Sequence, residues 1–543
     1  MPYNEAEQSW GDRCATALDA TEGSVGRRWD TNGNNSTRVW YTHSRATEAA
    51  RQKGQAHRMI TQIEIDGFKT FLDFKVELGP FQVLVGSNAS GKSNLFDALH
   101  LLSRLAEVDL RSAFQGLRGS PDDQFTLFPN GQRSDHIRIA VEMLVDRKAQ
   151  DELGQKTELT YTRLRYEIAV TFRTDTYGLQ SPYVLHESLQ SIPPDKDNWS
   201  REHGLFVQNG WLLDTATGQK TFIDTKPSKG RITKSVTPPA ESQMEYLKIF
   251  LYSDGDGQGN TKSFYADEVQ RTILSRTDEV DYPHVFAVRE ELRSLKFLHL
   301  NPDALRQPSL IKASSFLSSE GHNLPSMLAR LQAEDKHSLI DISRDMANLV
   351  PGFHRVKVEK DDARGDYEIV VETVDEHIQP AQVLSDGTLR LLALAAIRND
   401  PQYHGVLCLE EPENGVHPLH LHEMARILRE MATDFHDPRQ LNESLKQVLI
   451  TTHSPIFISQ PEIIDALLLV ITPRRVRYHN IPSVRLTQMV PVLTQRSHFQ
   501  LSSDPEDRAV DIYTIDMVRK YLESGFIDEA LTQLEQARET LTR

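Results

Sequence analysis

Hydrophobic and polar residues alternate regularly from about residue 59 onward. The segment MITQIEIDGF (59–68) has the period of two that is typical of a half-buried β-strand, and FKVEL (74–78) repeats it after a short loop. FQVLVG (81–86) is a continuous apolar run that ends at a glycine, which indicates a buried strand. The next segment, NLFDALHLLSRLAEV (94–108), has the apolar spacing of a helix.

The alternation continues in HIRIAVEMLV (136–145), LRYEIAVTF (164–172) and GWLLDTATGQKTFI (210–223), the last predicted as a hairpin around a Thr-Gly turn. These segments predict an antiparallel sheet beside the first strands. The middle of the chain, 238–351, is mostly helical in pattern and has no sustained heptads.

The C-terminal half alternates between apolar strands and helices, which predicts a largely parallel α/β core. The predicted elements are a hairpin (356–374), a strongly apolar helix (385–399), a buried strand (405–412), a helix (421–432), a second buried strand (446–455) and two amphipathic helices within 509–542, separated at Gly525.

These patterns divide the chain into five parts. They are a disordered leader (1–58), an N-terminal part with an antiparallel sheet (59–237), a helical insertion (238–351), a C-terminal part that completes the same domain (352–480) and a C-terminal helical tail (481–543). The leader has no sustained apolar period, although it holds Trp10, Trp29 and Trp40, so a partner-binding peptide is the alternative.

Composition describes an ordinary globular protein, with 38% hydrophobic and 25% charged residues. The longest apolar run, at 466–471, is too short to cross a bilayer, so a cytoplasmic protein without a membrane partner is expected. Two cysteines, Cys14 and Cys408, argue against a disulfide framework and a thiolate zinc site. With a formal net charge of −16, any DNA contact would need a local basic patch.

The segment GSNASGKS, from Gly86 to Ser93, matches the phosphate-loop pattern G-x-x-x-x-G-K-[ST] between a predicted strand and a helix. Its glycines let the backbone wrap a phosphate chain, and the helix directs free N–H groups at the anion. Lys92 would neutralise the β- and γ-phosphates of ATP, and Ser93 would ligate Mg²⁺. The predicted nucleotide-binding residues are Gly86, Ser87, Asn88, Ala89, Ser90, Gly91, Lys92, Ser93 and Asn94.

Paired acids end the buried strand VLCLEEP (406–412), at the strand end where open α/β sheets bind ligands. We expect Glu410 to hold Mg²⁺, through water, and Glu411 to polarise the attacking water. The alternative is a strand that ends in a solvated acidic loop. His453 follows the next buried strand, where its imidazole could reach the γ-phosphate. A lone histidine is more often structural, but the order of the three motifs favours catalysis.

The segment LSDGT (384–388) opens the apolar helix with an N-cap hydroxyl, Ser385, and a glycine backbone, Gly387. It is either a helix cap alone or a sensor of the γ-phosphate.

Taken together, GSNASGKS, LSDGT, VLCLEEPENGVHP and VLITTHSP resemble the phosphate loop, the signature, the acidic Walker B strand with its D-loop, and the switch histidine of ABC ATPases. The EEPENGVHP version resembles SMC/RecF-like ATPases, including those of bacterial Septu-type and overcoming-lysogeny-defect defence systems. The opening segment is similar to the first strands of that group.

The resemblance implies a P-loop NTPase of the α/β class, an ABC-type head with a mostly parallel core sheet, an antiparallel side sheet and a helical insertion. It implies a head dimer that sandwiches two ATP molecules with Mg²⁺. Ser385 and Gly387 would then touch the γ-phosphate held by the opposite protomer's Lys92. Residues 414–417 would form the D-loop at the seam, and Glu411 would drive hydrolysis to ADP and phosphate.

Several positions depart from the family pattern. Glu410 replaces the more usual Asp, and Asp386 stands where transporters usually carry glycine. The glutamine of the Q-loop stays open among Gln115, Gln124 and Gln132. Lys69 could touch nucleotide, but an exposed lysine is the simpler interpretation.

The leading functional hypothesis is an ATP-driven switch that controls a separate effector protein, a nuclease or toxin in phage defence, since the residues after His453 lack a Toprim nuclease pattern. It would act as a homodimer through its heads or in a larger assembly. The first alternative is a RecF-type repair ATPase that binds DNA through Arg104, Arg111 and Arg118, or through Arg474 and Arg475. A nucleotide-gated scaffold with negligible turnover is the second. A transporter subunit is disfavoured.

Overall fold

The structure is a computed structural model of the chain. It describes residues 59–150, 156–174, 180–203, 218–228, 246–253, 261–277, 282–311, 316–435, 437, 440, 444–471, 476–478, 481–484, 486–493 and 513–524. The predicted leader with its tryptophans, the first arm of the Thr-Gly hairpin, Arg474, Arg475 and the second C-terminal helix lie outside these residues.

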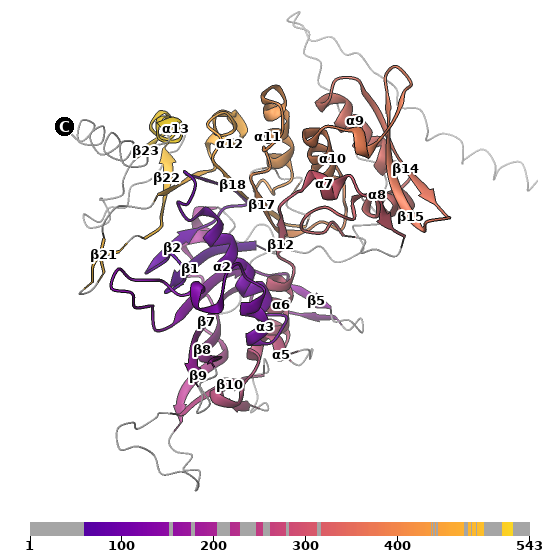
Figure 1. Cartoon of the computed structure of the whole chain (residues 1–543). Helices are drawn as coiled ribbons and strands as arrows, with labels where there is room; N and C mark the ends of the chain where they lie inside the picture. Colours follow the sequence, from indigo (N-terminus) through magenta and orange to yellow (C-terminus); the bar gives the residue numbers. More distant parts are fainter. Residues whose placement is uncertain are drawn as a thin grey trace, which may run out of the picture. The chain divides into compact units, whose positions relative to one another are not determined.

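A seven-stranded sheet forms the centre of the fold, and its first five strands are parallel (Figure 1). The two remaining strands add an antiparallel and then a parallel pairing at one edge. In order across the sheet, the strands are β12 (Lys296–Leu298), β17 (Gly405–Glu410), β18 (Lys446–Thr452), β3 (Phe81–Val85), β19 (Leu467–Ile471), β22 (Gln488–Leu493) and β23 (Tyr513–Thr514). The predicted mostly parallel core is confirmed.

Both faces of this sheet are buried, which explains why its strands are continuous apolar runs. Along β3, Val83 and Val85 belong to one hydrophobic cluster and Leu84 to the other. The first cluster contains apolar residues of helices α8 (Leu324–Glu334), α9 (Ser338–Leu349), α10 (Asp386–Arg398) and α11 (Leu421–Glu430). The second contains those of α2 (Lys92–Leu105), α3 (Leu110–Gln115) and α6 (Pro283–Arg293) together with the antiparallel sheet.

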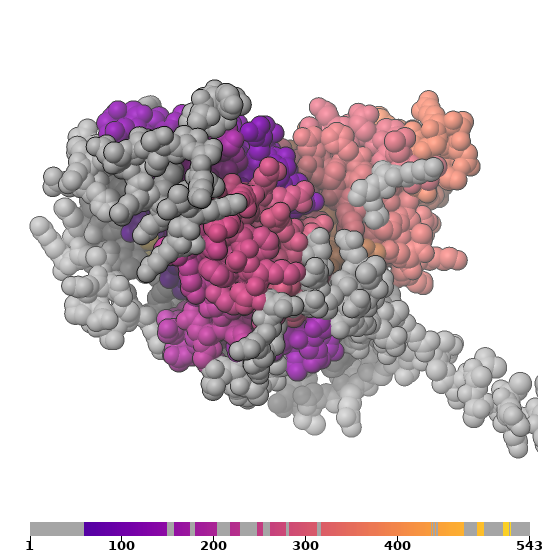
Figure 2. Space-filling model, turned by 90° about the horizontal axis from the view of Figure 1, so that it is seen from below, coloured from indigo at the N-terminus to yellow at the C-terminus, as the bar shows by residue number. Residues whose placement is uncertain are grey.

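The predicted antiparallel side sheet has eight strands among the described residues. They are β11 (Lys262–Tyr265), β10 (Tyr246–Leu251), β9 (Thr221–Ser228), β8 (Gln180–Ser191), β7 (Arg163–Thr174), β4 (Ile137–Leu144), β1 (Met59–Asp66) and β2 (Phe74–Glu77), in that order. The strands β10 and β11 fall in the range expected to be helical. Seen from below, the segment around residues 260–300, in pink, forms much of the visible surface (Figure 2).

A third sheet has four strands among the described residues, and all four lie between β12 and β17 in the sequence. It consists of β13 (Ser309–Leu310), β15 (Asp366–Thr373), β14 (Phe353–Asp361) and β16 (Ile378–Pro380). The strands β14 and β15 are the predicted hairpin, and α8 and α9 pack against them. The range 238–351, expected to be mostly helical, therefore also holds the short strands β10, β11, β12 and β13, which join all three sheets.

The remaining elements connect these layers. The short strands are β5 (Lys148–Gln150), β6 (Lys156–Glu158), β20 (Val476–Tyr478) and β21 (Ile481–Val484). The helices are α4 (Asn198–Glu202), α5 (Ile273–Arg276), α7 (Pro302–Leu305), α12 (Pro461–Ile464) and α13 (Ile515–Ser524). The 3-10 turns are η1 (Pro121–Gln124), η2 (Ala266–Glu268), η3 (Ala381–Val383), η4 (Pro418–His420) and η6 (Phe457–Ser459). Within the described ranges, no helix combines the length and apolar character needed to cross a membrane.

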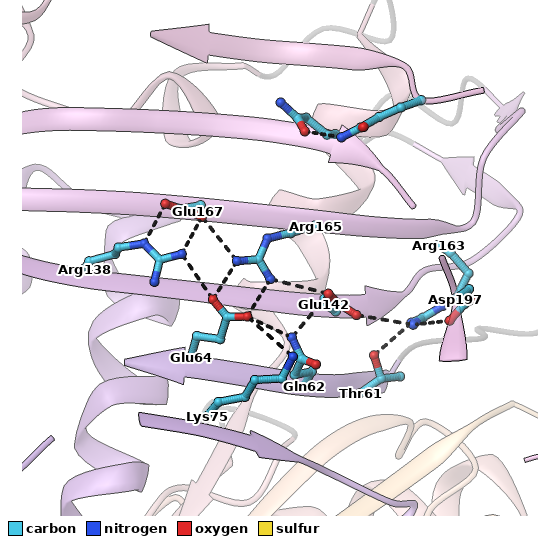
Figure 3. A network of polar contacts seen from close by, with 12 residues as sticks. Thr61, Gln62, Glu64, Lys75, Arg138, Glu142, Arg163, Arg165, Glu167 and Asp197 are labelled. Carbon is cyan, nitrogen blue, oxygen red and sulfur yellow. Dashed lines mark hydrogen bonds and ion pairs between the residues drawn. The ribbon is translucent and has the colours of Figure 1, made fainter. Parts of the chain in front are cut away.

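The polar face of the antiparallel sheet carries a network of alternating charges (Figure 3). Arg165 on β7 donates to Glu64 on β1 at 2.7 Å, and Arg138 on β4 bridges Glu64 and Glu167. At one end Arg163 forms a buried, bidentate pair with Asp197, at 2.9 and 3.0 Å. Cross-strand pairs of opposite charge of this kind fix strand register.

Candidate nucleotide-binding site

Three predicted site segments meet because their strands are neighbours in the sheet. The strands β17, β18 and β3 lie side by side and are parallel, so their carboxyl ends share one edge. At that edge, the Gly86 N–H donates to the Thr452 carbonyl at 3.3 Å, and the Glu411 N–H donates to the Thr451 carbonyl at 2.9 Å. The phosphate loop, the paired acids and the strand that leads to His453 are therefore brought together.

Two glycines of the phosphate loop lie where a larger residue would not fit. Gly91 has a φ of +100°, and a Cβ on it would lie 2.2 Å from the Thr487 hydroxyl oxygen. A Cβ on Gly86 would lie 2.5 Å from the Val470 carbonyl oxygen. Only glycine fits at both positions without movement of neighbouring atoms. The tight loop that the sequence motif predicts is thus formed.

Lys92 lies at the start of α2, and its ammonium is enclosed by the loop. Its Nζ donates to the carbonyl oxygens of Gly86 at 2.7 Å and Ser87 at 2.8 Å, and the residue is 6% exposed. Burial lowers the pKa of Lys92, and the nearby carboxylates of Glu411 and Glu413 oppose that shift. A buried cation inside a glycine loop at a helix N-terminus is a suitable cradle for phosphate oxygens.

The rest of the loop is partly open to solvent. Asn88 and Ala89 are exposed, Ser90 is buried, and Ser87, Ser93 and Asn94 are half-buried. Asn94 donates through Nδ2 to the Thr70 hydroxyl at 2.8 Å.

A contact that the sequence did not predict holds the loop from the far end of the chain. The Thr487 hydroxyl lies 2.7 Å from the Thr70 hydroxyl and donates to the Ser90 carbonyl at 3.1 Å. The Thr487 N–H donates to the Thr70 carbonyl at 2.9 Å. The residue before β22 therefore braces the phosphate loop, and no local motif marks it.

Two side chains hold Glu411. Asn414 lies on the paired-acid loop, which follows β17, and His453 lies on the switch loop, which follows β18. Glu411 Oε1 lies 2.8 Å from His453 Nδ1, and Glu411 Oε2 accepts from Asn414 Nδ2 at 2.8 Å. Burial alone would raise the pKa of Glu411, but the hydrogen bonds from Asn414 and His453 and the charge of Lys92 lower it. The left-handed φ of +44° at Glu411 is a strained conformation for a residue other than glycine. The result is an ionised carboxylate whose direction is fixed.

Glu410 forms an ion pair with Arg118, which lies in the segment after α3. Arg118 Nη2 lies 2.6 Å from Glu410 Oε1, and Arg118 Nε lies 3.5 Å from Asp97 on α2. Lys69 also binds Asp97, at 2.6 Å, and its side chain is 14% exposed. The interpretation of Lys69 as an exposed lysine is wrong, because this ion pair draws it against α2.

Glu410 and the Ser93 hydroxyl offer oxygens of the kind that Mg²⁺ prefers together with phosphate and water, and Glu410 is paired with Arg118 in this structure.

The signature residues contact the D-loop of their own protomer. Ser385 caps α10 by accepting from the Thr388 N–H. A Cβ on Gly387 would lie 2.7 Å from the Gly415 carbonyl oxygen, and Arg390 donates to the Asn414 carbonyl. These contacts are with the D-loop and with their own helix.

The Q-loop glutamine remains a prediction, although the structure describes all three alternatives. Gln115 and Gln132 are exposed. Gln124 is fully buried, and its Nε2 donates to the carbonyls of Arg118 and Ser120 at 2.8 and 3.1 Å. Gln124 thus holds the segment that presents Arg118 to Glu410.

Three of the five arginines suggested for DNA contact have protein partners, and Arg474 and Arg475 lie outside the described residues. Arg104 donates to the carbonyls of Ala113 and Ser112, and Arg111 donates to the Ser181 hydroxyl at 3.2 Å. Arg118 is engaged by Glu410, as described above.

Comparisons with known proteins identify the family of the chain. The family model described as "AAA ATPase domain" matches residues 59–458, and the chain belongs to that family. No curated protein matched the chain. The predicted membership of an ATPase family is thereby confirmed, and the finer assignment to SMC/RecF-like ATPases of the ABC type rests on the sequence motifs. A place among defence-system ATPases stays a prediction.

Similar solved structures include several SMC heads. One is the SMC head bound to the C-winged helix domain of ScpA, with 12% identity, a TM-score of 0.40, and coverage of 80% of this chain and 97% of that chain. The SMC head domain from Thermotoga maritima has 12% identity, a TM-score of 0.34, and coverage of 80% and 100%. The Pyrococcus furiosus SMC head with an extended coiled coil, bound to the C-terminal domain of ScpA, has 12% identity, a TM-score of 0.40, and coverage of 80% and 96%.

Proposed function

We propose that this protein hydrolyses ATP, with Mg²⁺, at a site that a second copy of the head completes, and that the cycle controls a separate effector protein. The observation that carries the hydrolysis is the ionised Glu411 carboxylate, fixed by His453 and Asn414 beside the phosphate loop.

In this proposal the chain's own residues divide the work. The backbone of the phosphate loop and Lys92 bind the phosphates, and Ser93 and Glu410 would hold Mg²⁺, which supplies positive charge to the β- and γ-phosphate oxygens when bound. Glu411 accepts a proton from the attacking water, and His453 orients Glu411 through their 2.8 Å contact.

Support for a second head comes from the surface around the signature. Ser385 and Asn414 are exposed, and the family pattern assigns Ser385 to the nucleotide of the opposite protomer and Asn414 to the dimer seam. Three large apolar side chains border the same motifs. Val383 precedes the signature and is 65% exposed, Leu419 follows the D-loop and is 80% exposed, and Ile456 follows His453 and is 50% exposed. Exposed apolar residues beside functional motifs favour an interface.

The nature of the effector rests on the resemblance to defence-system ATPases. A nuclease or toxin encoded as a separate chain is the proposed partner, because the residues after His453 lack the glutamate and paired-aspartate pattern of a Toprim nuclease.

The test combines turnover with assembly. We expect the wild-type protein to release phosphate from ATP, and Glu411→Gln to bind ATP, to turn over at least about a hundredfold more slowly, and to dimerise on adding ATP and Mg²⁺, as measured by light scattering after size exclusion. Ser385→Arg in the Glu411→Gln background should abolish the dimer. Ala333→Arg, on an exposed position of α8, is the matched control and should leave it intact.

Each part of the proposal has its own contradicting result. A wild-type protein that binds ATP without turnover would leave the scaffold alternative. A Glu411→Gln protein that stays monomeric with ATP would remove the shared site. Stimulation of turnover by DNA would favour the repair alternative over control of an effector.

A further inference from the structure

Glu413, the next glutamate after Glu411 on the paired-acid loop, is buried, whereas Glu411 is only partly buried. Glu413 is 6% exposed, and the Thr452 hydroxyl donates a hydrogen bond to its Oε1. Thr452 is fully buried and is the last residue of β18, directly before His453. The two side chains therefore join the loop that carries Glu411 to the strand end that carries His453.

Thr452 also forms hydrogen bonds with the phosphate loop and the switch loop. Its carbonyl accepts from the Gly86 N–H at 3.3 Å, at the start of the phosphate loop. Its hydroxyl oxygen accepts from the Ser454 N–H at 3.0 Å, on the switch loop. The Glu413 carbonyl accepts from the Val416 N–H at 3.0 Å, which closes the D-loop. One contact, between Glu413 and Thr452, thus links three loops.

The surroundings of Glu413 disfavour its ionised form. Burial raises the pKa of Glu413 to about 7, against the opposing hydrogen bond from Thr452. The charged or titratable groups near it are Glu411 and His453, and Lys92 and Arg390 interact with it electrostatically. Its second oxygen, Oε2, is buried without a hydrogen-bond partner among the described residues. A carboxyl that is buried and bonded to Thr452 in this way is suited to hold a loop.

We propose that Glu413 is a positioning residue whose buried carboxyl, through Thr452, holds the D-loop against the end of β18 and so sets Glu411 and His453 relative to the phosphate loop. The proposal rests on the proposed function for its effect on turnover. We call the contact between Glu413 and Thr452 the clip, and its structural role can be tested in a protein that does not turn over ATP.

Three variants separate this role from its alternatives. Glu413→Gln keeps an oxygen that accepts from Thr452 and removes the ability to ionise. Glu413→Ala removes the clip from one side, and Thr452→Val removes it from the other. Thr433→Val is the matched control, since Thr433 is a nearly buried threonine whose hydroxyl accepts from the Lys446 N–H at the opposite end of β18.

Hydrogen exchange of the segment 452–458 is the measurement that does not depend on activity. The Ser454 N–H bonds to the hydroxyl that the clip orients, so Glu413→Ala and Thr452→Val should exchange this segment at least about tenfold faster. Glu413→Gln and Thr433→Val should match the wild type. Unchanged exchange in Glu413→Ala would overturn the proposal.

Turnover gives the second measurement. We expect Glu413→Ala and Thr452→Val to lower kcat by roughly tenfold to a hundredfold, with an ATP dissociation constant within about threefold of the wild type, because misplaced catalytic groups slow the chemical step while the phosphate loop stays intact. Glu413→Gln should keep kcat within about threefold. If Glu413→Gln is as slow as Glu413→Ala, the carboxyl acts as a base or an ionised ligand and the positioning role is wrong.

The two proposals fail differently. A wild-type protein without ATPase activity, combined with fast exchange in Glu413→Ala, would contradict the proposed function and keep the clip. An active wild-type protein whose exchange and kcat are unaffected by Glu413→Ala would contradict the clip and keep the function.

Discussion

The stability of the side-sheet layer should depend on pH through one buried carboxyl, Glu187. This residue lies on β8 and is fully buried. Its Oε2 accepts from the Ile273 N–H at 2.8 Å and its Oε1 from the Leu274 N–H at 2.9 Å, at the start of α5, and Tyr166 donates to it at 3.2 Å. Burial nevertheless raises the pKa of Glu187 from 4.5 to about 7, against these three hydrogen bonds.

The sign and the size follow from linkage. Because the pKa is higher in the folded protein than in the unfolded chain, the protonated carboxyl favours folding. That contribution is complete below about pH 4.5, is lost as the pH rises through about 7, and stays constant above that. A difference of about 2.5 pKa units corresponds to roughly 3 kcal/mol, of which roughly 2 kcal/mol are lost between about pH 5.5 and about pH 8.

The assay compares Glu187→Gln with the wild type at both pH values, using the free energy of unfolding from denaturant titration and the hydrogen exchange of residues 270–277. The advantage of the glutamine variant should grow by roughly 2 kcal/mol from about pH 5.5 to about pH 8, because the amide cannot ionise. Glu359→Gln, an exposed change on β14, is the control and should show no such growth. Parallel pH curves for Glu187→Gln and the wild type would refute the assignment of a raised pKa to Glu187.

Two further changes test the network and the phosphate loop. Asp197→Ala removes the bidentate partner of the buried Arg163, which keeps its hydrogen bond to Thr61 and a Glu142 carboxylate 3.8 Å away, and should reduce the free energy of unfolding by about 3 kcal/mol. Asp341→Ala, in a more exposed pair, should cost less than about 1 kcal/mol in the same denaturation experiment. Similar losses for both would contradict the burial argument. Gly91→Ala should weaken binding of a fluorescent ATP analogue at least about tenfold, because its Cβ would collide with Thr487. Gly131→Ala, which has a positive φ of +81° but open space around it, should bind normally.

The local parts of the site were predictable from the sequence because each is short and continuous. The glycines and Lys92 of the phosphate loop, the paired acids at the end of β17 and the N-cap of α10 are all set by backbone periodicity and turn chemistry within about ten residues. The α/β alternation predicted a largely parallel core, and the structure has one, but the strand order that brings these parts together is known only from the structure.

Contacts between distant segments could not be predicted in this way. Thr487 braces the phosphate loop and Arg118 pairs with Glu410, yet neither lies in a motif. The position of Glu413 in EEPE was visible, but its burial against Thr452 depends on the packing of two strand ends. The short strands β10 to β13 were missed, because two to six residues carry too little periodicity to be told from helix or loop.

The place of β3 in the core sheet has a consequence for how the chain is made. Its two neighbours, β18 and β19, are the strands at 446–452 and 467–471, so the phosphate loop leaves the ribosome long before either exists. The strands β1, β4, β7, β8 and β9, by contrast, pair with partners close to them in synthesis order. We therefore expect the side sheet to assemble first on the nascent chain, and ATP affinity to arise only when the last fifth of the protein has emerged, since contacts between such distant segments form slowly.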